Sequence, residues 1–152
     1  MDDFEIRGAD QLARVHRALK AANVVGRREM NQRIRAAVKP LTPKTRAAAR
    51  AKLPQRGGLA DQVAREPQRV QIRTSARNAG VRLIVGKRRG GARSADEGMI
   101  RHPVPGGGWV DQPVTPGWFS DTIRAEGTAP ARHAIENALD DMARRIVREA
   151  GG

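Results

Sequence analysis

Large apolar side chains are scarce in this chain, and most of the aromatic ones stand in one stretch rich in proline and glycine. The 152 residues include two Trp, two Phe and no Tyr. Trp109, Trp118 and Phe119 all lie within residues 98–119, GMIRHPVPGGGWVDQPVTPGWF. A core built without these rings has to rely on aliphatic side chains and alanine, so it must be thin. We therefore expect one domain with a modest core that partner subunits complete.

The net charge of +13 is unevenly distributed along the chain. Residues 1–90 hold 22 Lys and Arg against 7 Asp and Glu, a net +15, whereas residues 91–128 hold 3 against 5. Over residues 27–56 ten basic residues stand against Glu29 alone. Such a segment attracts polyanions, because neutralising phosphates releases counterions. A solvated basic face explains the composition equally well, and the sequence leaves both interpretations open.

Hydrophobic periodicity predicts two long helices. Over residues 11–38 apolar or small residues recur at steps of three and four, which predicts one amphipathic helix that Pro40 ends. Residues 129–150 carry Ile135, Leu139 and Met142 at the same kind of spacing and predict a second helix. Its acidic residues precede its basic ones, in agreement with the helix dipole.

Strict alternation of apolar and polar residues predicts a small antiparallel sheet. Residues 69–74 and 80–86 read as two strands of a hairpin, and residues 4–7 read as a short edge strand. Residues 59–66 form a short helix candidate between a Gly-Gly pair and a proline. The predicted fold class is α+β, with the long N-terminal and C-terminal helices packed on the small antiparallel sheet.

Two segments lack such patterns. Residues 40–58 contain three prolines and many positive charges and are expected to be a flexible basic arm, with at most a turn of helix near residues 46–52. Residues 87–128 are expected to be extended Pro/Gly loops that project from the domain. A single domain of this size seldom needs so long an irregular stretch unless it binds something.

Residues that carry chemistry form no recognisable motif. His16, His102 and His133 stand in different predicted elements, without an acidic residue at the spacing of a zinc site. The Gly86-Lys87 pair lacks the upstream glycine and the following Ser or Thr of a phosphate-binding loop. The absence of Cys excludes disulfides and thiolate metal sites. We expect no cofactor, no metal and no enzymatic activity.

No targeting or membrane segment is expected. The N-terminal MDDFEIRG is acidic and lacks the apolar run of a signal peptide. Nowhere do about 20 consecutive apolar residues occur to span a bilayer. We therefore expect a soluble protein, made in the cytoplasm, without membrane contact.

Four features follow one another along nearly the whole chain. A long N-terminal helix ends in an Ala/Lys/Pro segment at residues 36–40, and a Pro, spacer, Gly, Leu element precedes a short helix at residues 53–60. A strand ending in Val85-Gly86 leads into a His/Pro loop, and Pro130 opens the last helix. In this order they resemble the head-tail joining and tail-completion (neck) proteins of long-tailed bacteriophages, minor tail components encoded between the head genes and the major tail protein gene. The loop motifs are similar to versions in actinobacterial phages.

The resemblance implies a structural virion protein of a siphovirus. Such a protein assembles as a homo-oligomeric ring, a hexamer with a dodecamer as the alternative, between the portal or connector of the filled head and the tail tube. Its partners would be the adjacent connector or stopper and the tail terminator or tail tube proteins. It would reside in the virion neck after assembly in the host cytoplasm.

A loop stiffened by proline and glycine that carries large rings is expected to dock on a neighbouring subunit. We expect one of its two tryptophans to cap the sheet instead, and replacement of either by alanine to impair assembly more than folding. The expected interface residues are Arg101, His102, Pro103, Val104, Trp109, Val110, Pro116, Trp118 and Phe119.

A basic surface is expected to face either the DNA in the channel, through non-specific contacts, or the acidic walls of neighbouring rings. The sequence leaves this choice open, with a slight preference for protein walls because a strongly basic lumen would hinder DNA ejection. The expected residues are Lys39, Lys44, Arg46, Arg50, Lys52, Lys87, Arg88, Arg89 and Arg93.

The alternative function is an autonomous basic nucleic-acid-binding protein, for which the net charge of +13 is typical. Neither a recognition-helix pattern nor strands studded with aromatic residues accompany the charge. Salt discriminates between the two hypotheses, because nucleic-acid affinity falls steeply with ionic strength.

Overall fold

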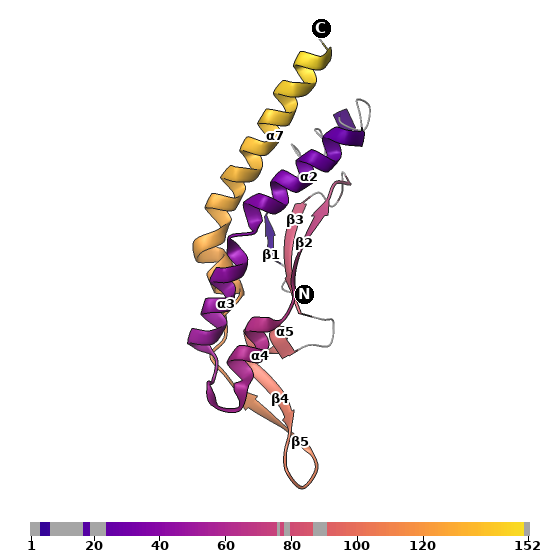
Figure 1. Ribbon diagram of the computed structural model, residues 1–152. Coiled ribbons are helices and arrows are strands. Elements are labelled where there is room, and N and C mark those ends of the chain that lie inside the picture. The colour runs from indigo at the N-terminus through magenta and orange to yellow at the C-terminus, as the bar shows by residue number, and fades with distance from the viewer. Residues whose placement is uncertain are drawn as a thin grey trace. The chain divides into compact units, whose positions relative to one another are not determined.

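A computed structural model describes residues 4–6, 17–18, 24–75, 77, 80–86 and 91–150. Figure 1 shows helices and strands in alternation, which confirms the predicted α+β class with long N-terminal and C-terminal helices. The elements in chain order are β1 (Phe4–Ile6), α2 (Val24–Val38), α3 (Leu41–Lys52), the 3-10 turn η1 (Arg56–Gly58), α4 (Leu59–Arg65), β2 (Gln68–Arg73), β3 (Gly80–Val85), α5 (Gly91–Asp96), β4 (Met99–Pro103), β5 (Trp109–Pro113), α6 (Ser120–Thr122), the π-helical turn η2 (Ile123–Gly127) and α7 (Thr128–Ala150).

The strands form two separate sheets. β1, β3 and β2 make a sheet in that order, and β4 pairs with β5 in a second one. The predicted pair of strands around residues 69–86 is therefore confirmed, as are the short helix α4 and the C-terminal helix α7. Of the helix expected over residues 11–38, α2 is the described part; most of the residues before Val24 lie outside the described ranges.

The chain divides into two compact units where we expected one core. Unit 1 consists mainly of Leu41–Arg69 and Ile84–Glu126, and unit 2 of the described parts of Glu5–Pro40, Val70–Leu83 and Gly127–Gly152. In unit 2, α2 lies beside α7 (Figure 1). The apolar stripes predicted for these helices supply much of the core of unit 2: Met30, Ile34, Val38, Ile135, Leu139 and Met142 are all buried.

The prediction of a flexible basic arm over residues 40–58 is wrong for most of these residues. Residues 41–52 form the helix α3, which packs against α4. Pro43 lies in the first turn of α3, where a missing backbone N–H breaks no intrahelical bond. The buried face of α3 consists of Leu41, Thr45 and Ala49 at steps of four. A helix that buries one threonine and one alanine has a weak apolar stripe, so its periodicity was not visible in the sequence.

The expectation of extended loops over residues 87–128 is also corrected. Residues 91–113 form α5, β4 and β5, and α6 follows at Ser120–Thr122. Residues 87–90 lie outside the described ranges. Most of this segment is therefore regular, and all of it up to Glu126 belongs to unit 1.

Candidate functional site

The hairpin of β4 and β5 is the most exposed regular part of unit 1. Every residue of β5 is exposed, and Ile100 is the only buried residue of β4. The pairing is antiparallel, with Met99 opposite Pro113 at one end and Pro103 opposite Trp109 at the other. Within unit 1 the hairpin extends away from α4 and α5 and ends in its connecting turn (Figure 1).

One face of this hairpin is largely apolar. Residues directly opposite each other in an antiparallel pair point to the same side of the sheet. Met99, Pro103, Trp109 and Pro113 therefore share a face, on which the exposed pair of Arg101 and Asp111 approaches to 3.9 Å. Met99 is 45% exposed and Trp109 is 62% exposed. A tryptophan this exposed at the end of a rigid hairpin is typical of a binding anchor.

Glycine makes the turn between the two strands possible. Gly106, Gly107 and Gly108 have φ values of 95°, 94° and 106°, which side chains with a Cβ rarely adopt. The N–H of Val104 donates to the carbonyl oxygen of Gly108 at 3.2 Å, and the N–H of Gly107 donates to the carbonyl oxygen of Val104 at 3.2 Å. These bonds order the turn, so the indole of Trp109 is held at a defined place.

The hairpin is tethered to the core of unit 1 by the residues that follow it. Trp118 is fully buried, and its Nε1–H donates to the carbonyl oxygen of Ala92 in α5 at 3.2 Å. The ring of Phe119 is also buried, with its centroid 5.5 Å from that of Trp118. The chain leaving β5 is therefore fixed to the helix that precedes β4.

Asp96 at the end of α5 strengthens this tether. Its Oδ1 accepts hydrogen bonds from the backbone N–H of Phe119 at 2.6 Å and of Ser120 at 3.2 Å. The N–H of Gly117 donates to the backbone carbonyl of Asp96 at 2.8 Å. A carboxylate that accepts backbone N–H groups where a helix begins acts as a cap, here supplied from a distant part of the chain.

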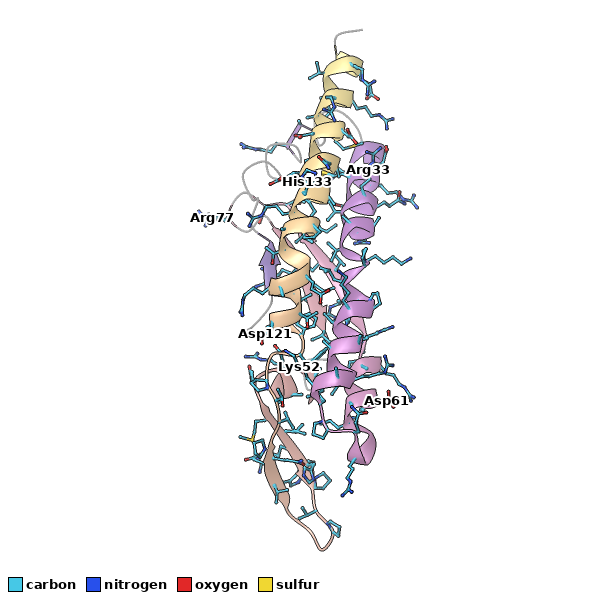
Figure 2. The ribbon with its side chains drawn as sticks, turned by 90° about the vertical axis from the view of Figure 1, so that its left-hand side faces the viewer. Arg33, Lys52, Asp61, Arg77, Asp121 and His133 are labelled. Atoms are coloured by element: carbon cyan, nitrogen blue, oxygen red, sulfur yellow. The ribbon has the colours of Figure 1, made fainter. Side chains whose placement is uncertain are left out.

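Lys52 and Gly117 connect the end of α3 to the same region. Nζ of Lys52 donates to the carbonyl oxygen of Gly117 at 3.0 Å and lies 3.8 Å from the carboxylate of Asp121. Both charged side chains are labelled in Figure 2. Gly117 has a φ of 77°, and a Cβ there would lie 2.0 Å from Oδ2 of Asp121. The positive φ therefore favours glycine at this position, and a larger residue would also have to displace the exposed Asp121 carboxylate.

A cavity of about 630 Å³ lies between the end of α3 and the segment that leaves β5. We call it the α3–β5 groove. Thr115 and Gln55 contribute polar atoms to it beside Lys52. The remaining lining side chains are small or apolar: Ala51, Leu53, Pro54, Pro113, Val114 and Pro116.

The predicted interface residues separate into two groups. Trp118 and Phe119 are core residues of unit 1, so their assignment to an interface is wrong. Trp118 folds back into its own unit, but its indole bonds to α5, and the expectation that one tryptophan caps the sheet stays a prediction. The structure places the others on or next to the hairpin: Arg101, Pro103, Trp109, Val110 and Pro116 are exposed, and His102 and Val104 are half-buried.

The predicted basic surface is not a single patch of free cations. Lys39 lies in unit 2, whereas the other described members lie in unit 1. Four of them pair with carboxylates: Lys44 with Glu126 at 3.2 Å, Arg50 with Asp61 at 3.0 Å, Lys52 with Asp121 at 3.8 Å and Arg93 with Glu97 at 2.8 Å. Arg46 is half-buried in α3, and Lys87, Arg88 and Arg89 lie outside the described residues.

Sequence reasoning missed Asp96 and the residues of the α3–β5 groove. Leu53 and Pro54 are sixty residues from Pro113 and Val114, so no local pattern joins them. Asp96 is separated from Phe119 by the entire hairpin. No spacing rule connects a cap to a helix start at that distance, so no signal in the sequence pointed to it.

Within the described ranges, no group of three or more His, Cys, Asp and Glu side chains is placed to hold a metal ion. None of the helices that the structure describes has the length and apolar character that crossing a membrane requires. Comparisons with models of protein families, with curated proteins and with solved structures found no match to this chain.

Proposed function

We propose that this protein is a structural subunit that assembles with copies of itself into a ring through its β4–β5 hairpin. The observation that carries the proposal is Trp109, which is 62% exposed at the end of an ordered hairpin that the buried Trp118 and Phe119 tether to unit 1. Most of its indole contributes no packing to its own unit, and exposing an indole is costly unless a partner covers it.

The α3–β5 groove is the receiving surface of the neighbouring copy. Along β5, four residue steps of about 3.4 Å place Trp109 about 14 Å from Pro113 at the rim of the groove. While the register of the hairpin holds, the indole therefore cannot enter the groove of its own chain. A groove lined by Leu53, Pro54 and Pro116 offers apolar contact to an aromatic ring from a second copy.

Two different surfaces on one unit support a ring. A contact in which the hairpin of one copy enters the groove of the next is heterologous, and such contacts close into a ring when the rotation divides the circle. The proposed ring is a hexamer, with a dodecamer as the alternative. The proposed activity is structural, without catalysis or a cofactor.

The proposed place of this ring is the neck of a long-tailed bacteriophage, where it joins the DNA-filled head to the tail. This part of the proposal is supported by the order of sequence features that resembles the neck proteins. The proposed partners are the adjacent connector or stopper and the tail terminator or tail tube proteins, and the proposed location is the virion.

The mass of the purified chain, measured by light scattering, tests the proposal. We expect an assembly that is a multiple of the 16.6 kDa chain and that closes at one discrete mass, either alone or after addition of tail or connector proteins. Trp109→Ala removes the anchor, and Thr115→Arg places a large side chain in the groove at an exposed position. Each variant is expected to stay monomeric.

Mixing the two variants sharpens the test. Trp109→Ala keeps an intact groove and Thr115→Arg keeps an intact hairpin, so a mixture contains one competent contact and should form dimers without rings. Val147→Ala is the matched control, because Val147 is 71% exposed but lies on α7 in unit 2. Assembly of Trp109→Ala to the same mass as the unmodified chain would refute the hairpin contact.

A further inference from the structure

Unit 2 contains a cavity of about 540 Å³ with an unusual excess of positive charge. Its volume lies within the range of about 300–1,000 Å³ that ligand pockets have. The helix α2 contributes Arg27, Arg28 and Arg35, and Ile72 of β2 is the only apolar side chain among the described lining residues. None of these described lining residues is a carboxylate.

The spacing of residues along α2 brings its polar side chains to this cavity. Arg27, Asn31 and Arg35 follow one another at steps of four residues, and Gln32 lies four residues after Arg28. Side chains at this spacing lie above one another on a helix. The adjacent stripe of α2, which includes Met30 and Ile34, is buried in the core and holds the helix in place.

Two polar atoms of this cluster are buried without a hydrogen-bond partner among the described residues. They are Nε of Arg27 and Oδ1 of Asn31. An unsatisfied buried polar atom has a free-energy cost. A ligand that accepts a hydrogen bond from Arg27 would remove this cost, and rotation of the Asn31 amide exchanges its oxygen for an NH₂ donor.

A second group of arginines in unit 2, Arg33 and Arg145, differs because its charge is paired with carboxylates. Arg33 and Arg145 both pair with Glu29, at 3.2 and 2.6 Å, and Arg33 also reaches Asp141 at 3.1 Å. There the charge is balanced within the chain. Among the described residues Arg27, Arg28 and Arg35 have no such carboxylate, so this part of the chain leaves their charge open to an anionic ligand.

We infer that this cavity, between α2 and the end of β2, binds the phosphate groups of a nucleic-acid backbone. Guanidinium groups offer paired N–H donors that match phosphate oxygens. The described lining residues include no aromatic side chain that would stack a free base. In sequence, residues 1–90 carry a net charge of +15, which favours a polyanion over a single small anion. The site is independent of the hairpin and of ring formation.

Fluorescence anisotropy with a short labelled DNA duplex tests the inference. Replacing Arg27, Arg28 and Arg35 together by Gln is expected to weaken binding roughly tenfold or more, because charge-assisted hydrogen bonds are lost. The slope of log Kd against log salt should decrease by about 1 to 2, since each phosphate contact contributes about 0.9.

The matched control replaces Arg65, Arg69 and Arg132 by Gln. These three arginines are exposed and are not among the described residues that line the cavity. Their replacement lowers the net charge by the same amount as the replacement of Arg27, Arg28 and Arg35. We expect the control substitutions to weaken DNA binding less than about threefold, because salt screens the attraction between the DNA and charges that do not contact it. Far-ultraviolet circular dichroism and thermal unfolding confirm that both variants are folded. Equal weakening by the two sets of substitutions would overturn the inference.

Two further ligands separate the sources of anionic charge. Inorganic phosphate at matched ionic strength should compete with the duplex only at millimolar concentrations, and polyglutamate should bind without dependence on the three arginines. If polyglutamate binding depends on them and DNA binding does not, the site recognises an acidic protein and the inference is wrong. The inference is also wrong if the binding of free phosphate depends on the three arginines and the binding of DNA does not.

Discussion

At the scale of single residues, two tryptophans nine positions apart have opposite environments. Trp109 lies on β5 of a two-stranded hairpin, where the face that it shares with Met99 stays exposed. Trp118 follows Gly117, whose positive φ turns the chain toward α5, and it is fully buried there. Both residues stand in a stretch with the same local composition of proline and glycine. Composition alone therefore cannot tell which tryptophan is an exposed interface residue and which is a core residue.

Replacing Trp118 by alanine should lower the free energy of unfolding by about 3–5 kcal/mol, because a large buried ring is lost and a cavity remains. This reverses the expectation from the sequence that the substitution impairs assembly more than folding. Urea unfolding followed by circular dichroism measures the change. Trp109→Ala serves as the control and should change stability by less than about 0.5 kcal/mol, as is usual for surface substitutions. Equal losses in both variants would contradict the assigned burial.

At the scale of elements, the sequence predicted the helices α2 and α7 but did not predict the helix α3. The helices α2 and α7 carry long apolar stripes, and both were expected. In α3 the fully buried Thr45 donates to the carbonyl oxygen of Thr42 at 3.0 Å and accepts a hydrogen bond from Nε2 of Gln68 at 2.9 Å. A hydroxyl satisfied by hydrogen bonds takes the place that an apolar side chain has in the other helices. The contact of α3 with Gln68 at the start of β2 therefore depends on polar pairing that periodicity does not detect.

Exposed charge pairs link α2 to α7. The Arg144 guanidinium, which donates a hydrogen bond to Asp141, and the nearby Arg33 hold the pKa of that carboxyl below its usual 3.8. The guanidinium pKa of Arg145 is raised by its hydrogen bond to Glu149 and by the charge of Glu29. All of these groups are exposed, so each pair contributes little to stability.

The pH dependence of this contribution follows from the lowered pKa of Asp141. Its stabilisation is fully present above the unfolded value of 3.8 and is lost as the pH falls through the lower folded value. Asp141→Asn should cause a small decrease in the thermal midpoint at neutral pH that disappears once the pH is below the lowered folded pKa of Asp141. Glu136→Gln is the control, because Glu136 is exposed on α7 and makes no ion pair with the described residues. A decrease that persists unchanged in acid would show that the charge of Asp141 is not its cause.

At the scale of the whole molecule, the chain combines apolar and electrostatic surfaces in different compact units. The hairpin and the α3–β5 groove belong to unit 1, and the arginine-lined cavity belongs to unit 2. These surfaces respond differently to salt, because screening weakens charge-based contacts and leaves apolar contacts intact. Ionic strength therefore separates self-assembly from nucleic-acid binding in one preparation.

The assembled mass should stay constant when salt is raised from about 50 to 200 mM, whereas a complex with six or more phosphate contacts should lose about 10³-fold in affinity. Light scattering combined with absorbance at 260 nm, on protein first freed of nucleic acid and then given DNA, follows both quantities. A chain that is monomeric at every salt concentration, and that binds DNA only at low salt, would refute the ring and favour the autonomous nucleic-acid-binding protein.

The sequence by itself determined the α+β class, the two long helices and the pairing of β2 with β3. These properties depend on period, turn residues and alternation, which are local. Only the tertiary structure decided that Trp118 is core, that residues 41–52 are a packed helix, that Asp96 caps a helix start 23 residues away and that Arg27, Arg28 and Arg35 share a cavity with β2. Each of these depends on contacts between residues far apart in the chain, and such contacts leave no periodic trace in a single sequence.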